Sequence, residues 1–185
     1  MSLKARSFFR AALALSALGL FLALPGLQQG ISAAGLHDPQ TDVQSLDSIL
    51  KAFYESLTFT EGSGPDWDRF RNLFASSTVP FVRTTPGAVL VTDLGGFLNN
   101  FGGRIKSGTL KSFREEETFR STESYGSFAQ MISTYRKGLN TADPQKSIRG
   151  INSFQLFFKD GRWWIASLMW EDESQANPIP AKYIR

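Results

Sequence analysis

Two apolar periodicities follow one another along this chain, and their order limits the folds that it can adopt. Between Ser45 and Gly103, apolar side chains recur at three- and four-residue steps in three stretches, which predicts three amphipathic helices. The predicted helix faces are Leu46, Ile49, Leu50, Phe53, Tyr54 and Leu57; then Trp67, Phe70, Leu73 and Phe74; then Leu94, Phe97, Leu98 and Phe101. Ser45, Asp66 (or Pro65) and Asp93 (or Thr92) are suitable first residues, and Gly102-Gly103 is expected to end the third helix.

After Gly103 the apolar residues alternate, which predicts strands over residues 110–121, 125–137, 147–159 and 162–172. A short strand is expected over residues 78–84, with a turn at residues 85–87. Asp160-Gly161 predicts a tight hairpin, because both central positions of such a turn favour positive φ. Helices followed by strands indicate the α+β class. We expect three helices packed on one curved antiparallel sheet, forming a cone with an open end.

The first residues have the order of a secretory signal. Lys4, Arg6 and Arg10 precede an apolar run over residues 11–24, and small residues follow Pro25-Gly26. The run of 14 residues is shorter than the roughly 20 that span a membrane, so an uncleaved anchor is the less favoured alternative. We predict a signal peptide over residues 1–34, a linker over 35–44 and one domain over 45–185. A bacterial periplasmic or secreted location follows from this interpretation.

Charge and cysteine content exclude several classes of function. The chain has 20 Lys and Arg against 17 Asp and Glu, and three of the basic residues lie in the predicted signal. The remaining domain is therefore neutral, which excludes a general electrostatic attraction to nucleic acid. The chain has no cysteine, so neither a disulfide-stapled scaffold nor a lipid-anchored cysteine is possible.

The aromatic content predicts either a dense core or an aromatic-lined cavity, since the chain holds 16 Phe, 4 Trp and 4 Tyr. The last predicted strand is apolar on both faces, where a sheet with one wet face would alternate more cleanly. Its expected faces are Trp163, Ile165 and Met169 on one side, and Trp164, Leu168 and Trp170 on the other. We expect a second copy of the protein to cover the outer face, as a homodimer. The alternative is that the C-terminal residues cover it.

Two glutamates are the most conspicuous candidates for a polar site. Glu115 and Glu117 share the parity of the apolar residues of their strand, which are Phe113 and Phe119. A buried carboxylate is unfavourable unless it is paired. Either glutamate therefore contacts a ligand or acts as an acid–base group with a raised pKa. The alternative is that the strand runs past the sheet, or bulges, and that the glutamates pair with Arg136 or Arg149 on neighbouring strands.

Other candidates lie on the neighbouring strands. Tyr125 and Tyr135 share one parity, so one of the two is expected to reach the interior. Asn152 and Gln155 lie on opposite faces of their strand, and whichever points inward is a candidate hydrogen-bonding group for a ligand. The structural alternative for both is a cross-strand contact.

The helices and the final hairpin, taken together, resemble a known superfamily. The residues that carry the resemblance are 50–54, 67–75, 150–157 and 161–165. They are similar to the nuclear transport factor 2-like superfamily, which includes SnoaL-like proteins and ketosteroid isomerase. Residues 178–183 look like those of an uncharacterised exported branch. The resemblance covers residues 45–185 and implies a cone-shaped fold with a pocket, often dimeric, without implying a reaction.

The resemblance also allows a test of the chemistry. Tyr54 approximately matches the oxyanion-donating tyrosine of the isomerase-like members, but the strand that holds their aspartate base has no carboxylate here. Tyr54 and Trp67 are candidate ligand contacts, although both are ordinary core residues. The only histidine is His37, in the predicted linker, so histidine catalysis and a histidine-rich metal site are not expected.

Three functions remain open. The first is an exported, non-catalytic domain that binds a small apolar or amphipathic molecule, without cofactor or metal. The second is an isomerase, cyclase or dehydratase that uses Tyr54 with Glu115 or Glu117. The third is a structural or assembly module whose cone is filled by its own side chains.

Overall fold

The computed structural model describes residues 38–184, and the predicted signal peptide lies outside them. The described residues belong to one compact unit. Its elements are η1 (Thr41–Val43), α1 (Leu46–Leu57), α2 (Trp67–Arg71), β1 (Pro80–Thr85), β2 (Ala88–Asp93), α3 (Leu94–Lys106), β3 (Phe113–Tyr125), β4 (Phe128–Leu139), η2 (Pro144–Lys146), β5 (Ile148–Lys159), β6 (Arg162–Asp172) and η3 (Ala181–Tyr183). This is the predicted α+β order, with one further strand.

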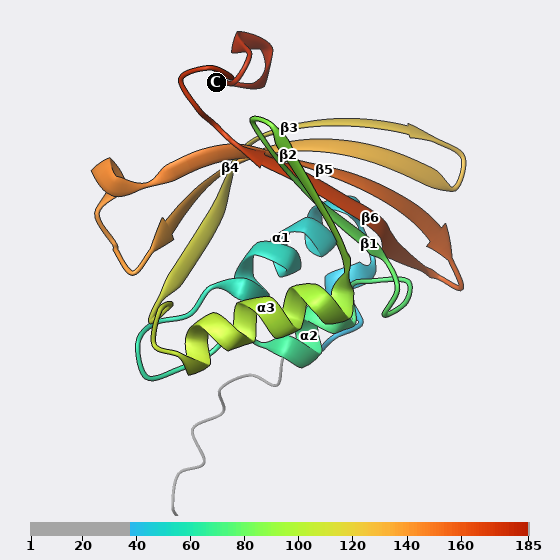
Figure 1. The fold of residues 1–185 in the computed structure, drawn as a ribbon. Helices are drawn as coiled ribbons and strands as arrows, with labels where there is room; N and C mark the ends of the chain where they lie inside the picture. The colour runs from blue at the N-terminus through green and yellow to red at the C-terminus, as the bar shows by residue number, and fades with distance from the viewer. Residues whose placement is uncertain (1–37, 185) are drawn as a thin grey trace, which may run out of the picture. The chain divides into compact units, whose positions relative to one another are not determined.

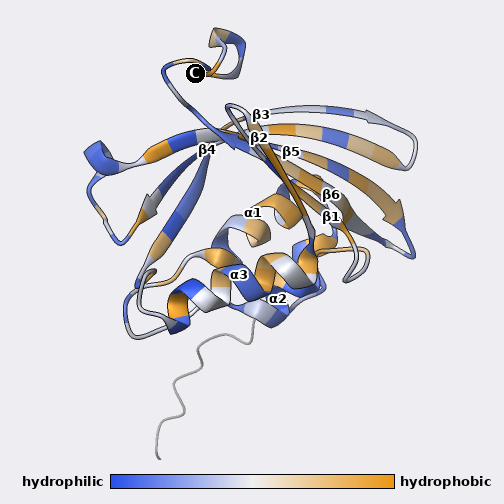
Figure 2. Cartoon of the chain, in the orientation of Figure 1, coloured by the Kyte–Doolittle hydropathy of each residue, from blue (hydrophilic) through white to orange (hydrophobic). Residues whose placement is uncertain are grey.

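The six strands form a single curved sheet in the order β2-β1-β6-β5-β4-β3, and the three α-helices lie against one of its faces (Figure 1). The predicted sheet was purely antiparallel, but β1 runs parallel to β6, so the sheet is mixed. β2 was not predicted because it carries consecutive apolar residues rather than an alternation, as Figure 2 shows. It returns from β1 through Gly87, whose φ of +83° suits glycine.

Local chemistry places the helix starts where the sequence predicts them. Ser45 and Ser48 form a reciprocal capping box at the start of α1, and Asp66 and Asp93 accept backbone N–H bonds at the starts of α2 and α3. The C-terminal ends of the helices differ more from the prediction than their starts do. α2 is a short helix, and α3 continues through the two glycines predicted to end it, since an interior glycine only weakens a helix by about 1 kcal/mol.

The predicted hairpin between β5 and β6 is confirmed, with positive φ at Asp160 (53°) and Gly161 (78°). Two β-bulges, however, reverse the parity that the sequence suggested. The register shifts at Thr118 on β3 and at Ala166 on β6. After each bulge the side chains exchange faces. Ile165 and Leu168 are therefore both buried on the inner face, although they were assigned to opposite ones.

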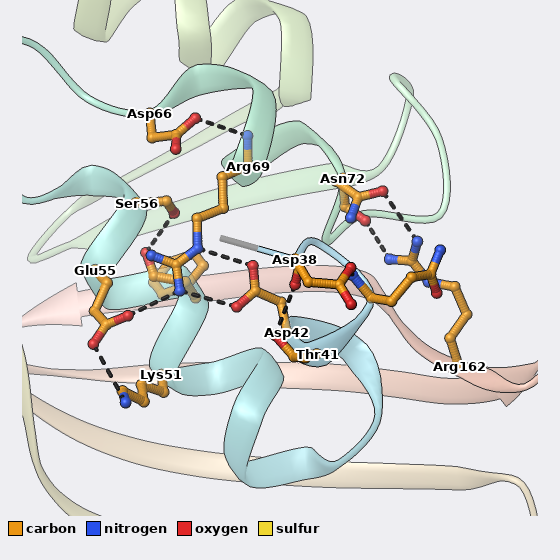
Figure 3. A network of polar contacts seen from close by, with 12 residues as sticks. Asp38, Thr41, Asp42, Lys51, Glu55, Ser56, Asp66, Arg69, Asn72 and Arg162 are labelled. Atoms are coloured by element: carbon orange, nitrogen blue, oxygen red, sulfur yellow. Dashed lines mark hydrogen bonds and ion pairs between the residues drawn. The ribbon is translucent and has the colours of Figure 1, made fainter. Parts of the chain in front are cut away.

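An ion-pair cluster, here called the Arg69 clamp, joins the N-terminal segment to the helices (Figure 3). The Arg69 guanidinium donates to both carboxylate oxygens of Asp42 at 2.9 Å and to Glu55 at 2.8 Å. Asp42 and Val43 of η1 are buried. These two residues fall in the stretch predicted to be a linker, so the packed domain begins before Ser45.

The C-terminal segment lies on the opposite face of the sheet from the helices (Figure 1). The Thr134 hydroxyl donates to the backbone oxygen of Tyr183 at 2.8 Å, and the rings of Phe119 and Tyr183 are 6.3 Å apart. Phe119 faces this way because it follows the bulge at Thr118. The C-terminal segment thus covers part of the outer face, which is the alternative to a second copy that the sequence left open.

Candidate functional site

A cavity of about 640 Å³ lies between α3, the β1–β2 hairpin and the inner face of the sheet. The sequence places aromatic residues on both walls because α3 and the strands each turn their apolar face inward. Its apolar lining includes Phe53, Phe97, Phe101, Phe113, Leu168 and Trp170. The helices and the sheet therefore leave an open space between them.

One side of this cavity is polar, and we call it the cavity floor: Arg83, Glu115, Lys137, Asn152 and Asp172. Asp172 contacts two other residues of the floor. Its carboxylate forms an ion pair with Lys137 and a longer one, at 3.3 Å, with Arg83. Burial alone would raise the pKa of Asp172, but the charge and hydrogen bond of Lys137 outweigh it and hold that pKa below its ordinary value.

Tyr135 donates a hydrogen bond to the same carboxylate. It is the inward-facing tyrosine of the pair considered from the sequence, and its ring lies directly over Gly150 of β5. A Cβ at Gly150 would lie 2.2 Å from the Tyr135 hydroxyl oxygen, so only glycine leaves room for the tyrosine to reach Asp172.

Glu115, also on the cavity floor, forms no ion pair with any residue that the structure describes. Its carboxylate accepts a hydrogen bond from the Asn152 side-chain amide at 3.3 Å. Burial raises its pKa to about 7, and the positive charge of Lys137 offsets only part of that shift. Although part of the residue reaches the surface, its carboxyl group is enclosed. Glu115 is thus the one carboxyl group of the floor that changes charge near neutral pH.

Tyr54 lies behind the cavity floor rather than in the cavity. Its hydroxyl is 2.7 Å from the Ser133 hydroxyl and accepts from Asn152 at 3.1 Å. Burial and the nearby Glu115 raise its pKa far above the ordinary value. Tyr54 and Glu115 also line a shallower groove of about 370 Å³ between α1 and β3.

Glu117 belongs to that groove and is not among the residues lining the cavity. It accepts hydrogen bonds from Arg120 and, at 2.6 Å, from Ser133. The expected partners were arginines of neighbouring strands. The bulge instead turns Arg120 of the same strand to the inner face, where it neutralises Glu117.

The remaining candidates lie away from the cavity. Trp67 packs edge-on against Phe101, with ring centroids 5.6 Å apart, and does not line the cavity. Tyr125 ends β3 at the hairpin and is 79% exposed. Gln155 is exposed on the outer face, so Asn152 is the inward-facing amide of that pair.

Sequence reasoning missed three charged residues of the cavity floor, Arg83, Lys137 and Asp172, and also Arg104 on α3. Lys137 could have been predicted from the sequence, because it shares the parity of Tyr135 two residues earlier. Asp172 and Arg83 enter the cavity because β6 lies between β5 and the unexpected parallel neighbour β1. The sequence pattern within β1 or β6 does not indicate that these two strands pair in parallel.

Within residues 38–184, no group of three or more His, Cys, Asp or Glu side chains is arranged to hold a metal ion. Over the same residues, no helix has the length and apolar content needed to cross a membrane.

Comparison with known protein families and with curated proteins finds no match to this chain. Solved structures do match. A structure named as a calcium/calmodulin-dependent protein kinase II association domain, from Xanthomonas campestris, has a TM-score of 0.51 at 15% identity and covers 76% of this chain and 99% of its own. A protein of unknown function from Mycobacterium tuberculosis has a TM-score of 0.51 at 16% identity, covering 73% of this chain and 79% of its own.

A further matching structure, from Shewanella baltica, is described as nuclear transport factor 2-like and of unknown function. It covers 70% of this chain and 91% of its own, at 12% identity and a TM-score of 0.48. At such identities the likeness is one of fold, not of activity. With its helices on one face of a curved sheet, the chain shares its α+β fold with the Xanthomonas campestris and Mycobacterium tuberculosis structures.

Proposed function

We propose that this protein is an exported domain that binds a small apolar or amphipathic molecule in its cavity without transforming it. The observation that carries the proposal is the cavity itself. Its volume of about 640 Å³ lies within the roughly 300–1,000 Å³ of typical ligand sites. Its walls are mostly aromatic and aliphatic, and its polar groups lie on the cavity floor and on α3. This is the usual division between groups that supply affinity and groups that orient a ligand.

A second candidate is an acid–base enzyme, and one observation favours it. Glu115 lies on the cavity floor with a pKa of about 7, close to the value that suits a general acid or base at neutral pH. The partner that the sequence suggested is less suitable, because Tyr54 lies behind the floor and its hydroxyl is engaged by Asn152 and Ser133. Binding without chemistry is therefore the better supported function.

Titration with phenylnaphthylamine, a neutral apolar probe that fluoresces in apolar surroundings, tests the proposal. We expect wild-type protein to bind it with micromolar affinity. Asn100 is exposed and lines the cavity, so Asn100→Trp should occupy the space and weaken binding at least tenfold. The matched control is Asn99→Trp, since Asn99 is exposed on the same helix and does not line the cavity.

No binding by the wild type, or equal binding by all three proteins, would refute a ligand site in this cavity. Glu115→Gln separates the two candidate functions once a natural ligand is known. A binding protein keeps its affinity for that ligand, and an enzyme keeps binding it but no longer converts it.

Export is part of the same proposal. If residues 1–34 are a signal peptide, protein recovered from the periplasm begins near Gly35. Intact-mass measurement of that fraction checks this, and a full-length chain there would contradict it.

A further inference from the structure

The charged groups around the cavity are unequally paired. Asp172 takes two of the three cations, Lys137 and Arg83. The third is Arg104, in the last turn of α3. Among residues 38–184, no hydrogen bond or ion pair to the Arg104 side chain is present. A half-buried guanidinium therefore faces the cavity with all of its donors free.

Arg104 does not stand alone. Asn100 lies four residues earlier on α3, on the same helix face, and also lines the cavity. Its side-chain amide likewise makes no hydrogen bond to any part of the chain that the structure describes. Helix-dipole compensation alone does not require Arg104 here, because Lys106 lies in the same last turn and is not among the residues that line the cavity.

These polar donors continue directly into the apolar wall. Phe97 and Phe101 come from the same helix and line the same cavity, and Trp170 lies within 6.2 Å of the Phe97 ring, centroid to centroid. One helix thus presents a guanidinium in its last turn, an amide one turn earlier and two aromatic rings to the same cavity. A ligand that matches this surface has an acidic end and an apolar body.

We propose that the cavity binds an amphipathic anion, with its carboxylate, sulfonate or similar acidic group on Arg104 and Asn100 and its apolar body along Phe97, Phe101 and Trp170. This inference rests on the proposed function. The planar guanidinium offers two parallel N–H donors to an oxyanion, which gives both attraction and orientation. The cavity residues carry three positive charges against at most two negative ones, so the excess also favours an anion.

Glu115 supports the same assignment. Its carboxylate faces Lys137 of β4, Asn152 of β5 and Asp172 of β6, with Tyr54 of α1 behind it. Because burial raises its pKa to about 7, much of the negative charge that would oppose an anion is absent at neutral pH.

A matched probe pair tests the proposal on the full chain. Anilinonaphthalenesulfonate is phenylnaphthylamine with one sulfonate added, so the two probes differ only in the acidic group. We expect Arg104→Gln to weaken anilinonaphthalenesulfonate binding about tenfold, the effect of losing one charge-assisted hydrogen-bonded contact. Phenylnaphthylamine binding should change less than twofold. Arg104→Lys, which keeps the charge and loses the planar fork, should recover part of the loss.

Lys106→Gln is the control, because it removes the same charge from the same helix turn outside the cavity, and both probes should bind it as they bind wild type. Equal weakening by Arg104→Gln and Lys106→Gln, or no weakening by Arg104→Gln, would overturn the anion site while phenylnaphthylamine binding still upheld the cavity. If neither probe binds wild type, the proposed function itself fails.

Discussion

The Arg69 clamp and the cavity floor are both clusters of partly buried charge, and they are built in opposite ways. In the clamp, one arginine meets two carboxylates at 2.8–2.9 Å, among closely packed helices. On the floor, one aspartate is shared by two cations, Glu115 has an amide for a partner, and about 640 Å³ of open space adjoins them.

The difference separates two uses of buried charge. A closed cluster with every group satisfied holds elements together, and removing one partner leaves an unpaired charge that destabilises the fold. An open cluster with a titratable carboxyl group and free donors nearby has groups available to something else. Substitutions in the clamp should therefore change stability and leave probe binding unchanged, whereas Asn100→Trp and Arg104→Gln at the cavity should change probe binding.

The largest effect is expected from Arg69→Ala. It leaves the Asp42 carboxylate buried without its bidentate partner, so the free energy of unfolding should fall by about 4 kcal/mol. Urea denaturation measures the loss, and phenylnaphthylamine affinity should stay unchanged under native conditions.

Arg71→Ala is the control on the same helix, since Arg71 pairs with an exposed aspartate at the surface. Equal free energies of unfolding for the two variants would show that the Arg69 clamp stabilises the fold no more than an exposed ion pair does.

A second effect concerns pH and the cavity floor. The pKa of Glu115 is raised from 4.5 to about 7 on folding, so the folded protein binds more protons than the unfolded chain between those values. Its contribution to stability is therefore full below pH 4.5 and lost as the pH rises to 7, by up to about 3 kcal/mol. Urea denaturation at pH 5 and pH 7.5 should show this fall in wild type.

In Glu115→Gln the group no longer titrates, and stability should change less over the same interval. A variant curve as steep as that of wild type would place the titrating group elsewhere.

Gly150→Ala should have an intermediate effect. The added Cβ would lie 2.2 Å from the Tyr135 hydroxyl oxygen and 2.5 Å from the backbone oxygen of Glu171, so the tyrosine must move away from Asp172. We expect a loss of about 2 kcal/mol, as for other overpacked interiors. Thermal unfolding followed by circular dichroism measures it.

Gly103→Ala provides the opposite control, because nothing lies within 4 Å of a Cβ there. It should raise stability by about 0.5–1 kcal/mol through helix propensity. A destabilising result at Gly103 would show that α3 does not extend through it.

The smallest effect is expected at Tyr54. Tyr54→Phe removes a hydroxyl that contacts Asn152 and Ser133, but each of these keeps a second partner, Glu115 or Glu117. The free energy of unfolding should fall by about 1 kcal/mol. Tyr125→Phe, at an exposed tyrosine, should match wild type in the same urea titration; equal losses at both positions would argue against the buried network.

Local patterns predicted most of the fold. The helix faces, the capping residues Ser45, Asp66 and Asp93, and the turn at Asp160-Gly161 each follow from chemistry within a few residues. The errors in which face a side chain occupies share one cause. A bulge at Thr118 or Ala166 adds a residue without any mark in the alternation, and every later side chain then changes face.

The site was less predictable for a related reason. Glu115 and Asn152 were found because a polar residue on an apolar face is visible in the strand itself. Lys137 and Asp172 come together from strands that are not neighbours, 35 residues apart in the chain. Arg104 is notable only for lacking a partner, which no sequence displays.

A crystal structure of the protein with phenylnaphthylamine tests the central claim most directly. We predict electron density for the probe inside the cavity, in contact with Phe97 and Trp170. A cavity closed by rearranged side chains, or a probe bound only in the groove between α1 and β3, would contradict the account.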